Sequence, residues 1–315
     1  MLHQVEHRLG LNRGASSHRK TLKMKENIYF PVYQKIEKEV IDLASSIYFS
    51  DGQTNVYSLH IADLIIRCSI ELESIVKDIY RENNGKEPKK PGDAFIQLDQ
   101  QWNLSKKELT IISPYAHFTT TFRPSFAPFN YKDKSPEDYF STYNAIKHDR
   151  LKNIEKANIY SLIRVLGALY ILNVYYRNER LFLYHDRYGS KINRSLGSDF
   201  FAFSVAPLED IVRLSSEYEI NPDACVYKIV RRESEFGFRI TYEELNGEMQ
   251  TWTMINIRSS FQEYAKSLIG QRIDKTAFLN NIHVTEETLL SQMKAKSIVR
   301  IESVKPKVTY SAIIK

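Results

Sequence analysis

Cysteine is almost missing from this chain of 315 residues, which contains only Cys68 and Cys225. Two distant cysteines exclude the disulfide framework of a small secreted protein. They also do not make a zinc ligand set. We therefore expect a reducing cytoplasm as the compartment and neither a metal nor a cofactor. Cys68 lies in an apolar helical pattern, which predicts a small core residue.

The sequence has no uninterrupted apolar stretch long enough to cross a bilayer. The longest candidate, residues 165–176, is too short and predicts a buried helix, so we expect no membrane association. The N-terminus has no apolar signal core, which argues against secretion. Met24 opens a stretch that resembles a natural start, and residues 1–25 are interpreted as a basic, disordered leader.

Glycine is scarce at 11 residues, whereas tyrosine and phenylalanine number 20 and 16. This mixture favours packed helices with aromatic contacts over a loop-rich scaffold. There is no glycine-rich phosphate loop and no metalloprotease or zinc-finger spacing. A net charge of +6 and a pI near 9.0 favour an anionic partner such as nucleic acid.

The spacing of apolar residues predicts a chain that is helical first and mixed later. Long helices are expected over 30–46, 56–82 and 155–178, and shorter ones over 92–102, 136–150, 256–268 and 285–294. Strands are expected over 224–230 and 236–245, with a closing hairpin over 298–315 that turns near Pro306.

This order of elements predicts a mainly α fold with two domains. A helical bundle is expected over residues 26–182. A polar, glycine-containing stretch at 183–194 is interpreted as the linker. Residues 195–315 are expected to form a smaller α+β domain of unknown type.

The helix predicted over 136–150 ends in the sequence YNAIKHDR. Asn144 and His148 are four residues apart and share a face, which Lys147 and Arg150 flank. An imidazole beside two cations suits phosphodiester cleavage. The imidazole acts as the base or acid, and the positive charge stabilises the phosphorane.

A second polar set lies on the long helix that precedes the motif. Asp63, Arg67 and Glu71 are spaced four apart and form an i,i+4 charge ladder. If this stripe faces the motif, Glu71 would orient His148 or Lys147, as a third group orients a catalytic base. The alternative is a structural ion-pair network, which is the commoner role of such a ladder.

The motif and its surroundings resemble the HEPN superfamily of helical proteins. The resemblance is carried by NAIKH after a proline-rich aromatic loop and by IADLIIRCSIELESIVK upstream, and it covers about residues 30–180. More narrowly, the chain is similar to an uncharacterised bacterial group with the pattern YNxxKHxR. The resemblance implies a compact, often dimeric bundle. Many such proteins are metal-independent RNases of toxin–antitoxin, abortive-infection and other antiviral systems.

By this resemblance, Asn144 takes the polar position of the family motif and His148 its histidine. Tyr143 stands where active members have arginine, and tyrosine supplies no permanent charge to a phosphorane. Lys147 or Arg150 would have to replace that charge. The resemblance also implies a homodimer in which two motif helices meet, with RNA as substrate and an antitoxin or another protein as a further partner.

The function expected from the sequence is that of a cytoplasmic, RNA-directed protein of a bacterial defence or toxin system. If active, it would cleave RNA without metal, through attack of the 2′-hydroxyl that leaves a cyclic phosphate. His148 would be the acid-base residue, with Asn144 positioning the substrate and Glu71 in support.

Two alternatives stay open. One is a non-catalytic interaction protein whose Asn144 and His148 hydrogen-bond across a helix pair. The other is a ligand sensor whose second domain binds the ligand. The single histidines are interpreted as structural or surface residues: His60, His117, His185 and His283.

Overall fold

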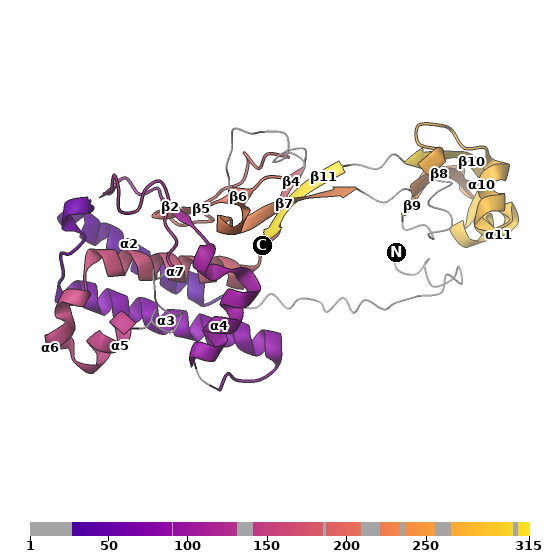
Figure 1. Ribbon diagram of the computed structural model, residues 1–315. Coiled ribbons are helices and arrows are strands. Elements are labelled where there is room, and N and C mark those ends of the chain that lie inside the picture. The colour runs from indigo at the N-terminus through magenta and orange to yellow at the C-terminus, as the bar shows by residue number, and fades with distance from the viewer. Residues whose placement is uncertain are drawn as a thin grey trace. The chain divides into compact units, whose positions relative to one another are not determined.

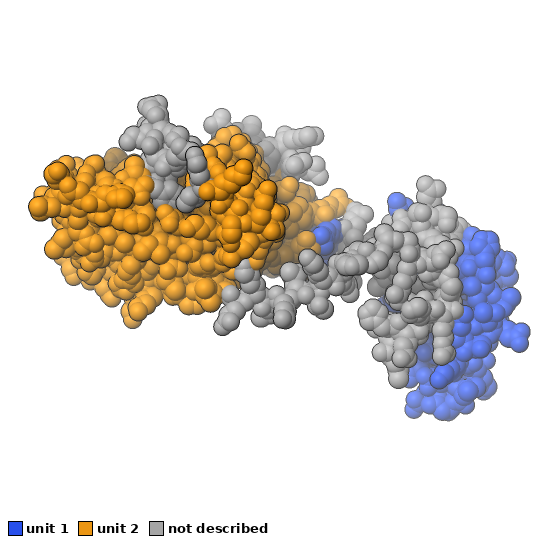
Figure 2. Space-filling view, turned by 90° about the horizontal axis from the view of Figure 1, so that it is seen from below, with its two compact units in different colours: residues 1–24, 232–309 blue, residues 25–231, 310–315 orange. Residues whose placement is uncertain are grey.

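The chain divides into two compact units, shown in orange and blue in Figure 2. The larger unit comprises residues 25–231 and 310–315, and the described part of the smaller one lies within 232–309. The computed structural model describes residues 27–89, 91–130, 141–184, 187–208, 221–233, 237–255, 266–304 and 308–315. The expected leader over residues 1–25 lies outside these ranges.

The helices of the larger unit are arranged around α3 (Leu59–Asn84), which contacts α2, α4, α5 and α7 (Figure 1). Their bounds are α2 (Tyr29–Ser46), α4 (Pro91–Trp102), α5 (Ser141–His148), α6 (Arg150–Asn153) and α7 (Ile159–Arg177). The helices predicted over 30–46, 56–82, 92–102 and 155–178 are confirmed within a few residues at each end.

Capping residues set the bounds of α3. The Ser58 hydroxyl accepts a hydrogen bond from the Ile61 amide at 3.1 Å, which satisfies an amide that the first turn leaves without a partner. Gly85 ends the helix in the left-handed conformation, with φ at 67°. Between these caps one apolar stripe is buried, and Cys68 lies in it with no exposed surface. The prediction that Cys68 is a core residue is confirmed.

Helix α7 is the core helix of the larger unit. Among the described helices it alone is long and apolar enough to cross a membrane, but 78% of that stretch is buried inside the protein. The buried helix predicted over 165–176 is therefore confirmed. Gly167 lets α7 approach the chain beside it, because a Cβ there would lie 3.1 Å from Pro128 Cγ and 3.2 Å from Leu109 Cδ1.

The prediction of a mainly α fold was wrong. The described residues are 48% helical and 23% strand, and they form four small sheets. Three of these sheets lie in the larger unit, and two of the three are short pairs: β1 (Phe49–Ser50) pairs with β3 (Ala116–His117), and β2 (Leu109–Ile111) pairs with β5 (Phe201–Phe203). Strands of two or three residues are too short to show the alternation by which strands are recognised in a sequence.

A four-stranded sheet shows how the two units are connected. Its order is β4 (Leu181–Tyr184), β11 (Val308–Ile314), β7 (Tyr227–Glu233) and β6 (Val205–Ala206). The smaller unit is inserted between β7 and β11, which are neighbours in this sheet (Figure 1). The linker expected at 183–194 instead begins within β4 and lies inside the larger unit.

The smaller unit is a three-stranded antiparallel sheet with two short helices. Its strand order is β10 (Ala295–Val304), β8 (Gly237–Glu244) and β9 (Met249–Ile255), with α10 (Lys275–Ile282) and α11 (Glu286–Met293). Its buried core comprises Phe238, Ile240, Ile273, Phe278, Leu279, Leu289, Ile298 and Ile301. The strands predicted over 224–230 and 236–245 and the helix predicted over 285–294 are confirmed.

The hairpin predicted over 298–315 was wrong. Strand β10 pairs with β8 in the smaller unit, and β11 pairs with β4 in the larger one. Two adjacent strands in the sequence therefore belong to different sheets, because the chain returns to the larger unit between them. The helix predicted over 256–268 lies almost entirely outside the described residues.

Candidate functional site

Helix α5 presents the polar residues of the motif to solvent. Tyr143 and Ile146 are buried against the rest of the larger unit, whereas Asn144, Lys147 and His148 are exposed. In the part of the chain that the structure describes, no hydrogen bond or ion pair holds the Asn144 or His148 side chain. The Lys147 ammonium lies 5.2 Å from the centre of the Tyr143 ring. The exposed imidazole and ammonium are accessible to a ligand.

The predicted helix over 136–150 is interrupted at Asp149. This residue has φ −147° and ψ 82°, and its carboxylate caps the short helix α6. The Asn153 side chain stabilises the chain at this break, because its Nδ2 donates a hydrogen bond to the Asp149 carbonyl at 2.8 Å. Arg150 therefore belongs to α6 and not to the helix of the motif. The first part of the predicted helix falls within residues 131–140, outside the described ranges.

The three charged residues of the α3 ladder have different partners. Arg67 makes two hydrogen bonds to Glu39 on α2, at 2.5 and 2.9 Å. Asp63 pairs with Arg150 on α6 at 3.1 Å. Both acid–base pairs connect helices, so they fix how α2 and α6 sit on α3. Because the side chains of Asp63 and Arg150 are 61% and 43% exposed, this pair is worth at most about 1 kcal/mol.

Glu71 does not reach the motif. It is half-buried, and burial raises the pKa of its carboxyl group while the charge of Arg67 opposes that rise. Its negative charge acts on Tyr29 of α2. Among the described residues, no hydrogen bond or ion pair connects Glu71 to His148 or Lys147. No contact among the described residues therefore supports the role expected for Glu71.

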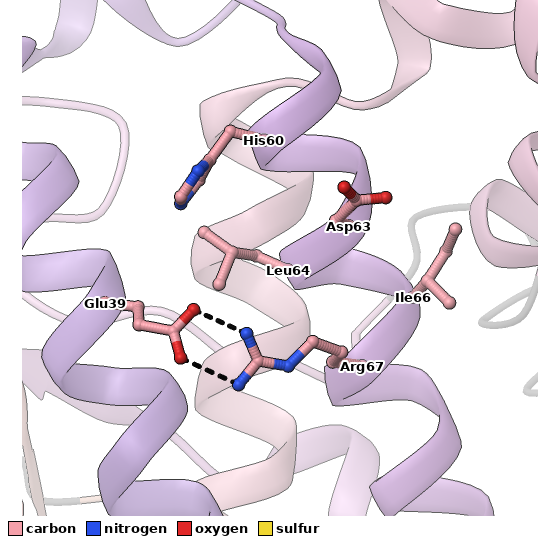
Figure 3. A pocket seen from close by; sticks show the side chains of 6 residues that line it. All are labelled: Glu39, His60, Asp63, Leu64, Ile66 and Arg67. Carbon is pink, nitrogen blue, oxygen red and sulfur yellow. Dashed lines mark hydrogen bonds and ion pairs between the residues drawn. The ribbon is translucent and has the colours of Figure 1, made fainter.

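A surface pocket of about 440 Å³ lies over the N-terminal half of α3 (Figure 3). It is lined by Glu39, His60, Asp63, Leu64, Ile66 and Arg67. Figure 3 shows Glu39 reaching from α2 to the Arg67 guanidinium, with His60 on the same side of α3. Two of the predicted site residues, Asp63 and Arg67, line this pocket. Through Asp63, it borders the helix that follows the motif.

His60 was missed as a site residue because it was interpreted as an isolated histidine. Its spacing held the signal: His60, Leu64 and Arg67 are four and three apart, so they share a face of α3. The exposed His60 imidazole, together with the paired Glu39 and Arg67, gives the pocket groups that accept and donate hydrogen bonds. Hydrogen bonding by Arg67 keeps the pKa of the Glu39 carboxyl low.

Lys107 is the buried cation of a second cluster, at the start of β2. Its ammonium donates hydrogen bonds to the carbonyls of Asp223 and Cys225, at 3.1 and 2.9 Å. Burial, and then the charge of Lys315, lower the pKa of Lys107 from 10.5 to about 8. Since its donors are used on backbone carbonyls, Lys107 ties two distant segments together.

The lowered pKa of Lys107 predicts a pH-dependent stability. Below about pH 8, Lys107 is charged in both states and the cost of burying it is complete. Between about pH 8 and 10.5, the unfolded chain binds more protons, so the free energy of unfolding rises with pH. Between about pH 7 and about pH 9.5, the free energy of unfolding of the wild type should rise by about 2 kcal/mol more than that of Lys107→Met.

Urea unfolding at the two pH values measures this difference. Lys106→Met is the matched control, because Lys106 is exposed and pairs with Asp223 at 3.1 Å. That variant should follow the wild type across the range. If the unfolding free energy of wild type and of Lys107→Met changes equally with pH, Lys107 is not the group with the lowered pKa.

Tyr143 stands where the HEPN resemblance would place an arginine, and its burial predicts the effect of introducing one. Tyr143 is 4% exposed, so Tyr143→Arg replaces a buried ring with a charge that faces the interior. We expect a loss of about 3 kcal/mol in unfolding free energy and faster hydrogen exchange along α5. Ser141→Arg, at an exposed position of α5, is the control and should change stability little. Unchanged stability with increased RNA cleavage would show that position 143 faces the site.

Comparison with known proteins gives no relative: the chain matches no family model, no curated protein and no solved structure. The HEPN resemblance therefore rests on the residues of the motif and its surroundings and stays a prediction.

Proposed function

We propose that this protein is an RNA-directed protein of the HEPN type that cleaves RNA without a metal ion. The observation that carries the proposal is the exposure of Asn144, Lys147 and His148 on one face of α5. Buried, hydrogen-bonded side chains at these positions would have favoured a structural role. Buried polar side chains are normally hydrogen-bonded to other protein groups, whereas these three face solvent and are open to a ligand.

In the proposed reaction, His148 takes the proton from the 2′-hydroxyl of a ribose. The 2′-oxygen then attacks the adjacent phosphorus, and the bond from phosphorus to the 5′-oxygen breaks. The products are a 2′,3′-cyclic phosphate and a 5′-hydroxyl, whose proton comes from solvent or from the histidine of a second copy. Lys147 supports the reaction by stabilising the charge of the phosphorane.

Lys147 is the cation best placed to replace the missing family arginine. Tyr143 is buried at that position, and Arg150 lies on α6, beyond the break in the helix at Asp149. The Lys147 ammonium projects from the same exposed face as His148. We assign the phosphate-stabilising role to Lys147 and give Arg150 the secondary role of holding α6 on α3.

A second candidate function is a non-catalytic interaction protein, and Leu151 is the observation that favours it. This apolar side chain directly follows the motif and is 89% exposed. An exposed leucine beside exposed polar residues suits an interface with a second copy or another protein. A homodimer through α5 and α6 is compatible with both functions, because it would place two copies of the motif in one cleft.

Incubation of the full chain with total bacterial RNA and with tRNA, in EDTA, tests the proposed function. We expect cleavage products with 2′,3′-cyclic phosphate and 5′-hydroxyl ends. Intact RNA after prolonged incubation, from a protein that is folded and dimeric, would overturn the nuclease and leave the interaction protein.

A further inference from the structure

Aromatic side chains in and beside the two short strands β1 and β3 face solvent. Phe49 and Ala116 pair in register and are buried, whereas the adjacent Tyr48, Tyr115 and His117 are exposed. Tyr48 is 62% exposed, and its ring stacks on the His117 imidazole, with centres 4.6 Å apart and planes within 10°. We call Tyr48, Tyr115 and His117 the aromatic platform.

Asp51 anchors the loop that follows the platform. Its carboxylate accepts hydrogen bonds from the Thr119 hydroxyl at 2.7 Å and from the Thr119 and Thr121 amides at 2.8 Å. These donors, the Thr119 hydroxyl first, hold the pKa of the Asp51 carboxyl well below its usual range. The anchor therefore stays charged, and the platform is held in place before any ligand arrives.

The platform lies at the same end of the larger unit as the motif. The segment 51–57 connects β1 to α3, and its Thr54 carbonyl accepts a hydrogen bond from the Tyr160 amide at 3.0 Å. Tyr160 is in the first turn of α7, directly after the segment 150–156 that contains α6. Figure 1 shows α5 and α6 at the end of the bundle where α3 begins.

This end of the unit also carries a cluster of exposed cations, which we call the basic rim. Its members are Lys147, Arg150, Lys152 and Lys156. Asp63 and Asp149 pair with two of them, at 3.1 and 3.4 Å. Such exposed pairs are weak, so the cations can exchange these partners for a phosphate at little cost.

We propose that the aromatic platform and the basic rim bind single-stranded RNA, with unpaired bases stacking on Tyr48 and His117 and phosphates directed toward His148. This inference rests on the proposed function, whose substrate it narrows to unpaired RNA. A duplex hides the faces of its bases, so only an unpaired strand can use stacked rings as a surface. A protein partner is the less favoured occupant because the rim is basic and the rings are aligned for stacking.

Fluorescence anisotropy with a labelled, unstructured RNA of about 15 nucleotides measures the binding directly. The full chain with His148→Ala is used throughout, so that cleavage does not interfere. Adding Tyr48→Ala and His117→Ala together should weaken binding roughly tenfold or more, since stacking contributes that much per base. Tyr48→Phe keeps the ring and should bind like the parent.

Phe182→Ala is the matched control, because Phe182 is 70% exposed on β4 and is not part of the platform. It should leave binding unchanged. A blunt-ended duplex of the same length, which has no unpaired base, should bind more weakly to the parent and show no dependence on the rings. Equal affinity for single strand and duplex would overturn the proposal, as would binding that survives loss of both rings.

The outcomes separate this proposal from the proposed function. If the wild type cleaves RNA but binding does not depend on the Tyr48 and His117 rings, the RNA-binding role of the aromatic platform is overturned and the nuclease stands. Ring-dependent binding without cleavage by the wild type would support the platform and overturn the nuclease. Absence of RNA binding by the parent, with circular dichroism showing a folded chain, would overturn the platform.

Discussion

Replacing His148 with alanine is expected to lower RNA cleavage in EDTA by about 10²–10⁴-fold, the usual contribution of a general acid-base residue. The imidazole is exposed at the end of α5 and makes no hydrogen bond within the described residues, so its removal should leave the fold intact. The measurement is the initial rate of tRNA cleavage by wild type and variant. Circular dichroism and thermal unfolding then confirm an unchanged fold.

The control for this experiment is an exposed histidine in the other unit. His283 caps α10 in the left-handed conformation, with φ at 54°, so His283→Asn is the substitution that its backbone tolerates. This variant should cleave like the wild type. Lys147→Ala should also reduce the rate, and Lys147→Arg should retain most of it. Equal rates for wild type and His148→Ala would place the chemistry elsewhere or show a contaminating nuclease.

The substitution Glu37→Leu is expected to destabilise the larger unit by about 3–5 kcal/mol. Glu37 is 3% exposed, and its carboxylate accepts hydrogen bonds from the hydroxyls of Tyr33 and Ser198, each at 2.5 Å. The amides of Asp199 and Phe200 also donate to it, each at 3.2 Å. Leucine would leave these donors without the carboxylate, and α2 would lose the three hydrogen bonds that Glu37 accepts from the segment that leads into β5.

Urea unfolding followed by Trp102 fluorescence measures this loss. Trp102 stacks on Tyr175 in the larger unit, so Trp252→Phe should serve as the background that removes the signal of the smaller unit. Glu39→Leu is the matched control on the same helix. Its pair with Arg67 is partly exposed and should be worth about 1 kcal/mol or less. Equal losses for the two variants would contradict the role of the Glu37 network.

Much of the helical part of this protein was predictable from local pattern. The stripe through Cys68 and Leu72 recurs at the helical period, and that period alone orients α3. The same spacing put Asn144 and His148 on one face of α5, and the structure exposes both of them. These features depend on residues three and four apart, which helix geometry brings together in any context.

The partners of the charged residues were not predictable in this way. Arg67 lies one turn from both Asp63 and Glu71, yet it bonds to Glu39 on another helix. Which ion pairs form depends on which helices approach each other. The i,i+4 pairs expected within α3 are worth only a few tenths of a kcal/mol, so a better-placed partner on another helix is preferred. The pocket with His60 has the same origin, since it needs α2 beside α3.

The sequence by itself thus determined where the long helices begin and end and which of their faces are buried, because those features follow from the helical repeat and from caps. Only the tertiary structure decided that β10 and β11 enter different sheets and that the smaller unit is inserted between neighbouring strands. Pairing of strands distant in sequence depends on the approach of whole segments, and no local pattern records that approach.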